Sequence, residues 1–273
     1  MLPEIIRNGL TRGLVELRHS ITLVFNYVFF PSLALIATSF LRGIELAGSG
    51  ASVGQYAIPG IVAMNVLFTG LMGLATTLIT EREDGTLLRA RSVPNGIHSY
   101  LLGKVTTQVV LIVATMAVVL VEAALLFRGS LSVEVANLVH LAWILPLALL
   151  ATLPFGALLG ALISNPRHLS FMSLVLMGVV SVSGVFYPLA RMPEWVQVVG
   201  QSTPLYWMGL GLRSTMLGDQ VLASEIGQSW RLPETAAVLT LWSVVGVVLA
   251  VRVLRGAARR QGGSRRRGRR AVP

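Results

Sequence analysis

The stretch that decides the fold is residues 101–127, which read LLGKVTTQVVLIVATMAVVLVEAALLF and carry only Lys104 and Glu122 as charged residues. A helix that crosses about 30 Å of hydrocarbon, rising 1.5 Å per residue, needs about 20 mostly apolar residues. This stretch is long enough and apolar enough. In hydrocarbon, a single backbone segment can satisfy its own hydrogen bonds only as a helix. It therefore predicts a membrane-spanning helix.

Five further stretches have the same character, at residues 21–41, 56–79, 136–163, 169–189 and 235–254. The whole chain of 273 residues is 54% hydrophobic and 12% charged, against about 25% charged residues in an ordinary soluble domain. We therefore expect an all-α integral membrane protein with six spans in residues 21–255. The alternative for the first run is a signal sequence, since Ala37 and Ser39 resemble a cleavage site, but its apolar core is too long and residues 1–20 precede it.

Basic residues set the orientation, because Lys and Arg collect on the cytoplasmic side during insertion. With the N-terminus inside, 17 of the 22 Lys and Arg residues are cytoplasmic. The outer side keeps Arg42, Arg128, Arg191, Arg213 and Arg231. We therefore expect both termini in the cytoplasm.

The two ends of the chain differ from its apolar centre. Residues 1–20 place Leu2, Ile6, Leu10, Leu14 and Leu17 on one helical face, which predicts an amphipathic interfacial helix on the inner leaflet; a start that merely frays is the alternative. Residues 256–273 are rich in Arg, Gly and Ser and should form a disordered tail that faces anionic membrane lipids. Nucleic-acid binding would need a folded basic surface or interleaved aromatic residues, and the tail has neither.

A dense charged patch, Glu81-Arg82-Glu83-Asp84-Gly85-Thr86-Leu87-Leu88-Arg89, separates the second and third spans on the cytoplasmic side. Gly85 interrupts it and Pro94 ends it, so a short helix parallel to the membrane is expected at about residues 81–94. Charged side chains can orient a soluble partner, and Leu87 with Leu88 can fill an apolar groove. An ordinary solvated loop is the alternative.

The pattern Glu-Arg-Glu-x-Gly-Thr-Leu, followed by a basic run and Val93-Pro94, resembles the signature of ABC-2 type permeases, the membrane subunits of ABC exporters. Residues 191–217 agree, with Arg191-Met192-Pro193-Glu194-Trp195 and then Pro204-Leu205-Tyr206. That segment looks like the pair of outer re-entrant helices of the ABC-2, or type V exporter, fold. Within the family the chain is most similar to the drug-resistance branch, of the daunorubicin-exporter kind, while exporters of lipid-linked saccharides or glycolipids share the fold.

The resemblance implies a partner for the charged patch. In this family the loop is a coupling helix that docks on a separate ATP-binding subunit, which assigns ATPase coupling to Glu81, Arg82, Glu83, Gly85, Thr86 and Leu87, and Leu88 completes the apolar contact. Two such subunits would bind ATP and Mg, and a second permease chain would complete the exporter, by default as a homodimer, with a heterodimer as the alternative. Arginine is far more frequent than lysine, which favours a bacterial inner membrane location.

The chain itself offers no catalytic, cofactor or metal site. A P-loop needs Gly-x-x-x-x-Gly-Lys-Ser/Thr, but the sole lysine, in Gly103-Lys104, is followed by Val105. Without cysteine it has no thiolate ligand, and its four histidines are isolated. We therefore expect a permease without enzymatic activity, or, as the rival class, a scaffold that recruits a soluble protein without transport.

Two weakly polar stripes are candidates for the substrate path. One lies on the second span and the other on the fifth: Asn65, Thr69, Met72 and Thr76; Ser170, Ser173, Met177 and Ser181. Such residues suit hydrophobic or amphipathic cargo, but they also let helices pack closely. Glu122 is an intramembrane ionisable residue near the outer end of its span, with proton or substrate coupling, snorkelling, or pairing with Arg128 as the alternatives. Trp195, Tyr206, Trp207 and Trp230 suggest an outer aromatic belt.

Overall fold

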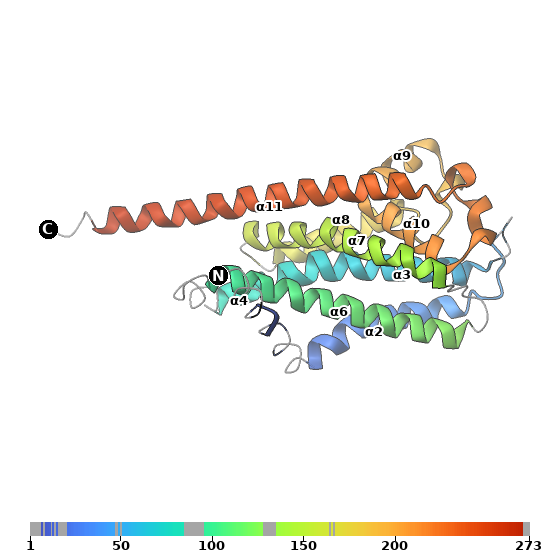
Figure 1. Ribbon diagram of the computed structural model, residues 1–273, viewed down its shortest axis with the longest axis horizontal. Helices are drawn as coiled ribbons and strands as arrows, with labels where there is room; N and C mark the ends of the chain where they lie inside the picture. The colour runs from blue at the N-terminus through green and yellow to red at the C-terminus, as the bar shows by residue number, and fades with distance from the viewer. Residues whose placement is uncertain are drawn as a thin grey trace.

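The computed structural model describes residues 7, 9–11, 13, 15, 21–46, 49, 51–84, 96–127, 135–163, 165 and 167–269. Within these ranges the side chains of residues 21–26, 96–98, 135–138, 220 and 254–269 are left undescribed. The described chain is almost entirely helical, with long helices running side by side (Figure 1). They are α2 (Ile21–Ser39), α3 (Val53–Leu67), α4 (Leu74–Glu83), α6 (Gly96–Leu126), α7 (Val135–Leu162), α8 (Arg167–Val182) and α11 (Leu232–Arg269).

Four helical segments have the length and apolar composition to cross a membrane alone: Val53–Glu83, Ser99–Leu126, Val139–Leu162 and Leu232–Val253. They match the predicted second, third, fourth and sixth spans. Two shorter apolar segments, Tyr27–Ser39 and Arg167–Val182, lie where the first and fifth spans were predicted. The all-helical membrane class is confirmed, and spanning by these two remains a prediction.

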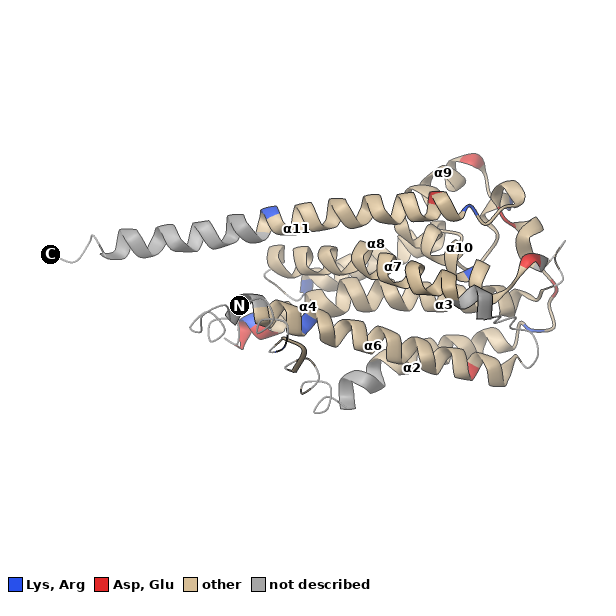
Figure 2. Cartoon of the chain, in the orientation of Figure 1, with Lys and Arg blue, Asp and Glu red and all other residues tan. Residues whose placement is uncertain are grey.

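Charged residues gather toward the two ends of the bundle, and the band between them is almost entirely uncharged in the described part of the chain (Figure 2). This distribution fits a membrane that surrounds the central band, because a charge in hydrocarbon is costly. The end predicted to face the cytoplasm carries the last turn of α4, and the opposite end carries the segment between α8 and α11.

The second span is a continuous helix that starts at a capping box. Ser52 Oγ accepts from Gln55 N at 3.2 Å, and Ser52 N donates to Gln55 Oε1 at 2.6 Å. The helix runs through α3, a π-helical turn at Phe68–Gly73 and then α4. α7 packs directly on this turn, because a Cβ at Gly156 would collide with the carbonyl oxygen of Gly70.

The second span also absorbs the start of the charged patch. No glycine or proline separates Leu74 from Glu83, so α4 continues the span through Glu81, Arg82 and Glu83 and ends at Asp84. The prediction of a separate short helix beginning at residue 81 was therefore wrong for these three residues. Its remainder, up to residue 94, lies outside the described residues.

The predicted fifth span ends earlier than expected, at Val182 instead of residue 189. Gly184 adopts φ +65°, a conformation that favours glycine, and the chain turns there toward a short 3-10 helix at Leu189–Arg191. Two short helices follow, α9 (Glu194–Ser202) and α10 (Pro204–Met216), in the segment predicted to re-enter the membrane. Their position relative to the membrane remains a prediction.

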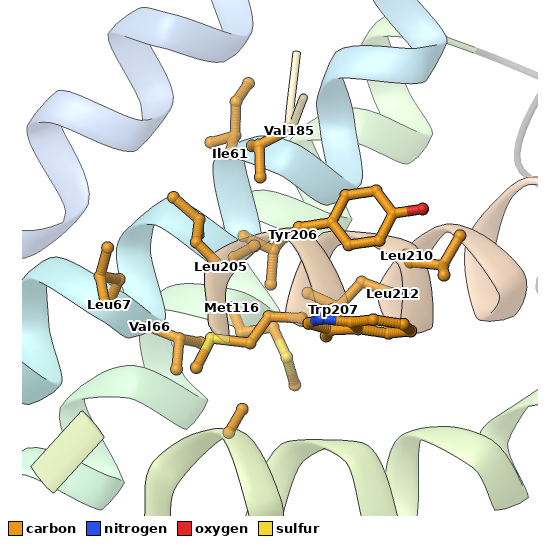
Figure 3. Close-up of a cluster of buried hydrophobic side chains, with 14 of the residues drawn as sticks. Ile61, Val66, Leu67, Met116, Val185, Leu205, Tyr206, Trp207, Leu210 and Leu212 are labelled. Atoms are coloured by element: carbon orange, nitrogen blue, oxygen red, sulfur yellow. The ribbon is translucent and has the colours of Figure 1, made fainter. Parts of the chain in front are cut away.

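The α10 helix lies at the centre of the hydrophobic core. Leu205, Tyr206, Trp207 and Leu210 are buried, and the helix packs on α3, α7 and α11 (Figure 3). Tyr206 and Trp207 are therefore core residues, and their assignment to an aromatic belt was wrong. Trp195, on α9, is exposed over 66% of its surface and fits a belt.

The chain ends also differ from the prediction in part. α11 remains helical through Arg269, whereas a disordered tail was expected from residue 256. Arg, Ala and Gln are good helix formers and no proline interrupts the segment, so the span helix continues although Gly256, Gly262, Gly263 and Gly268 weaken it. At the other end the described residues between Arg7 and Val15 are helical, and Thr107 Oγ1 donates to Gly13 O at 3.4 Å, so this segment rests on α6.

Candidate functional site: the cytoplasmic coupling end

Glu81 is held against α6. Its Oε1 forms an ion pair with Lys104 Nζ, and its Oε2 accepts a hydrogen bond from the Tyr100 hydroxyl. The Lys104 ammonium also lies 5.8 Å from the centre of the Tyr100 ring, a cation–π arrangement. The Lys104 side chain is only 9% exposed and that of Glu81 19%, so the pair is largely removed from water and its charges are weakly screened.

Arg82 contacts a different helix, α7, at its carboxyl end. Its Nη1 donates to Ile163 O at 3.3 Å, and its Nη2 donates to Gly160 O. The last carbonyls of a helix have no partner within that helix and carry the negative end of its dipole. Arg82 therefore caps α7 with a favourable charge, which joins the end of the second span to the end of the fourth.

The predicted coupling residues thus separate into three groups. Glu81 and Arg82 are engaged within the chain, whereas they had been expected to orient a soluble partner. Glu83 is exposed at the end of α4, beside the exposed Asp84. Gly85, Thr86, Leu87 and Leu88 lie outside the described residues.

Sequence reasoning missed Lys104 and Tyr100 as members of this site. Lys104 had served only to test a P-loop and to count charges. A usable signal was present, because the sole lysine of the chain lies four residues after Tyr100 in an otherwise apolar run, which places both on one helical face.

The second-span stripe of the predicted substrate path is mostly packed inside the molecule. Asn65 is 7% exposed and Thr69 1% exposed, Met72 is partly buried, and Thr76 is exposed. Among the described residues Asn65 Oδ1 has no hydrogen-bond partner. Within this single chain, Asn65 and Thr69 therefore do not face an open path.

The fifth-span stripe faces outward. Ser170, Met177 and Ser181 are exposed and Ser173 is partly buried. The serine hydroxyls donate to their own helix, Ser173 to Ser170 O at 2.7 Å and Ser181 to Met177 O at 2.9 Å. α8 packs mainly on α9, whereas α3 packs on α10 and α2. At the other end of α8, Leu169 forms a small buried cluster with Ala75 and Ile79 of α4, so the two spans meet there beside Ser170 and Thr76.

Glu122 contacts the first span. Ser32 Oγ, on α2, donates to Glu122 Oε1 at 2.9 Å. The alternative partner considered above, Arg128, lies outside the described residues. The carboxyl group therefore joins α2 to α6 instead of extending freely into lipid.

A second charged cluster, which the sequence did not reveal, is buried at the outer end. Arg213 on α10 pairs with Glu225, whose Oε1 also accepts from the Tyr56 hydroxyl at 2.8 Å. The Arg213 guanidinium carbon lies 4.8 Å from the centre of the Tyr56 ring. Burial alone lowers the pKa of Arg213, but Glu225 raises it, and the net pKa lies above the ordinary value. Arg213 and Glu225 therefore form an ion pair within the core.

These features define a multi-pass, all-helical membrane protein in which the charged end of the second span is bound to the third and fourth spans. The chain belongs to the ABC-2 family of transporter proteins, whose profile matches residues 26–252. The family resemblance seen in the sequence is thereby confirmed. The family domain is the non-catalytic membrane component of the transporter, and ATP binding belongs to a partner ATP-binding subunit.

Among curated proteins, the chain is similar to the daunorubicin resistance ABC transporter permease protein DrrB1 of Streptomyces coeruleorubidus. The two are 27% identical over 224 residues, which cover 77% of this chain and 74% of the relative. The chain is thus a permease subunit with a distant relative in drug resistance.

Proposed function

We propose that this permease exports hydrophobic or amphipathic cargo, with energy from two copies of a separate ATP-binding subunit. The observation that carries the proposal is the attachment of the coupling end: Glu81 is bound to α6 through Lys104 and Tyr100, and Arg82 is bound to the end of α7. A push on this end would act on three spans at once. The name of this relative, which refers to daunorubicin resistance, supports export of a drug-like compound.

The division of labour within the charged patch follows from its contacts. Glu83 and Asp84 are exposed and free to meet a soluble partner, with Gly85 to Leu88 completing the contact. Glu81 and Arg82 transmit the movement of that partner, because Glu81 is bound to Lys104 of α6 and Arg82 to the terminal carbonyls of α7. From α7 the movement reaches α11 and the second span, on which α7 packs.

The exposed face of α8 supports the cargo class and the assembly. Phe171, Leu174 and Met177 are exposed over 69%, 69% and 50% of their surfaces, and the serine hydroxyls between them are already bonded to the helix. Such a face suits an apolar surrounding. We propose that it meets a second permease chain in a homodimer and borders the cargo path, in the inner membrane of a bacterium.

The test is reconstitution of the permease with the ATP-binding protein encoded nearest to it. We expect a stable complex whose ATP turnover changes when hydrophobic drugs are added. The Glu83→Gln, Asp84→Asn double variant should weaken complex formation, whereas Glu81→Gln should keep the complex and lose the drug response. A complex that forms normally with all variants and never responds to cargo would favour the scaffold class. Stimulation by lipid-linked saccharides alone would favour that exporter branch.

A further inference from the structure

We propose that Glu122 and Ser32 form a binding site for the protonated amine of an amphipathic cargo, in the outer half of the bundle between α2 and α6. The proposal deepens the exporter function proposed above and rests on it, because only an exporter has a cargo to bind. The site lies apart from both predicted path stripes, which are on the second and fifth spans.

Only one of the two carboxyl oxygens of Glu122 accepts a hydrogen bond from a described residue. Oε1 accepts from Ser32 Oγ at 2.9 Å, which fixes the orientation of the group. Oε2 is buried and has no hydrogen-bond partner among the described residues. A buried carboxylate oxygen without a partner is strongly unfavourable, so the site has the charge and the free acceptor that an ammonium group satisfies.

The charge of Glu122 is also not balanced elsewhere in the described chain. The ion pairs of the described residues use other carboxylates, those of Glu81, Glu225 and Glu234. Glu122 lies four residues before the end of α6 at Leu126, which is about 6 Å below that end at 1.5 Å per residue. A cation that reaches this depth must come from the membrane phase or from within the bundle.

The residues that flank the carboxyl group expose an apolar surface. On α6 the neighbouring Val121 and Leu125 are exposed over 61% and 62% of their surfaces. On α2, one turn from Ser32, Phe29 is 45% exposed and packs edge-on against Phe30 with ring centres 5.5 Å apart. Aliphatic and aromatic side chains beside a carboxylate match a molecule with an apolar body and a cationic end.

An amine without its own anion fits better than the headgroup of an aminophospholipid. A phospholipid would bring its phosphate a few ångströms from the amine and below the level of the headgroups. No Lys or Arg of the described residues forms an ion pair with Glu122, so no described ion pair supplies a cation there that could balance a phosphate. Charge complementarity therefore selects a monovalent organic cation.

The experiment uses the full-length chain in nanodiscs of pure phosphatidylcholine, without any ATP-binding subunit. The probes are dansylcadaverine, a fluorescent apolar amine, and its N-acetyl derivative, which has nearly the same body without the charge. We measure equilibrium binding of each probe, corrected with empty discs. Wild-type protein should bind the amine about tenfold more tightly than the acetylated probe, the contribution of one hydrogen bond to a charged group.

The isosteric variant Glu122→Gln should bind the amine no better than the acetylated probe, and it keeps an acceptor for Ser32. Ser32→Ala should lower amine affinity by a smaller factor, because the carboxylate remains. Glu194→Gln, at an exposed carboxyl group at the start of α9, is the matched control and should retain the tenfold preference. Thermal unfolding of each variant shows that loss of binding is not loss of fold.

Two results would overturn the proposal. One is an unchanged amine preference in folded Glu122→Gln protein, which would make the Ser32 contact purely structural. The other is loss of the preference in wild-type protein when phosphatidylethanolamine is added to the discs, which would assign the site to lipid. Because no ATP-binding subunit is present, a failure here is distinguishable from a failure of the exporter assignment, which is judged by cargo-dependent ATP turnover.

Discussion

Arg213 Nε lies 2.7 Å from Glu225 Oε1, and both side chains are almost completely buried. Arg213 belongs to α10 and Glu225 follows it in the outer segment, and Tyr56 of the second span bonds to the same carboxylate. Arg213 Nη1 has no partner among the described residues. The cluster joins the outer segment to the second span through two buried charges, which solvent screens only weakly.

The first prediction concerns the stability of this pair. Removing one partner from a buried ion pair leaves an uncompensated charge and costs about 3–5 kcal/mol, whereas replacing both by apolar residues is often close to neutral. Glu225→Gln and Arg213→Met should therefore each lower the unfolding temperature of detergent-solubilised protein more than the double variant Arg213→Met, Glu225→Leu. Additive losses in the double variant would contradict a coupled pair.

A second prediction concerns the ion pair between Glu81 and Lys104 at the coupling end. Glu81→Lys places two cations together and should abolish cargo-dependent ATP turnover. The exchange variant Glu81→Lys, Lys104→Glu restores opposite charges in the same place and should recover part of the response. Glu83→Lys with Lys104→Glu is the matched control and should recover nothing, because Glu83 is exposed at the end of α4.

Arg82 carries the third prediction. Arg82→Ala removes the cap of α7. Each lost hydrogen bond from the charged donor should lower the free energy of unfolding by at most about 1.5–3 kcal/mol, and by less where water takes the place of the guanidinium group. Arg82→Lys keeps the charge but cannot reach both Gly160 O and Ile163 O in fork geometry. We expect reduced transport in both variants and greater protease sensitivity near residue 163 in Arg82→Ala. Equal behaviour to wild type would remove α7 from the coupling route.

The fourth prediction tests the assembly, and the absence of cysteine from the chain makes it direct. Nothing lies within 4 Å of a Cβ built at Gly178, on the open face of α8. Gly178→Cys should form a cross-linked dimer with a mild oxidant in native membranes. Leu241→Cys, on an exposed part of α11, is the control and should remain monomeric on a denaturing gel. Cross-linking of the control alone would move the interface to α11.

The fifth prediction addresses the cargo path. Ser181→Leu enlarges an exposed position of α8. If this face borders the path, the variant should change the relative transport of large and small drugs while the complex with the ATP-binding subunit stays intact. Unchanged transport of every cargo would mean that the stripe serves helix packing alone.

The sequence predicted the parts of the fold that depend on local composition. Four of the predicted spans are present in the predicted order, because a membrane admits few alternatives to an apolar helix. The run from Glu81 to Thr86, together with the outer Pro-Glu-Trp motif, indicated the family. Boundaries were less accurate where one backbone conformation decided them, as at Gly184, where the chain turns before the predicted end of the fifth span. Local pattern also could not show that α4 carries Glu81 as part of the second span's helix.

Only the tertiary structure decided which polar groups meet. The sequence identified Glu81, Lys104, Glu122 and Arg213 as charged residues in or near apolar segments, but not that Glu81 pairs with Lys104 or that Glu122 meets Ser32. It also assigned Tyr206 to an outer aromatic belt, whereas Tyr206 is buried in the core. The physical reason is that hydropathy and helical periodicity are local properties of a chain, whereas the partner of a buried polar group depends on which distant helices pack against it.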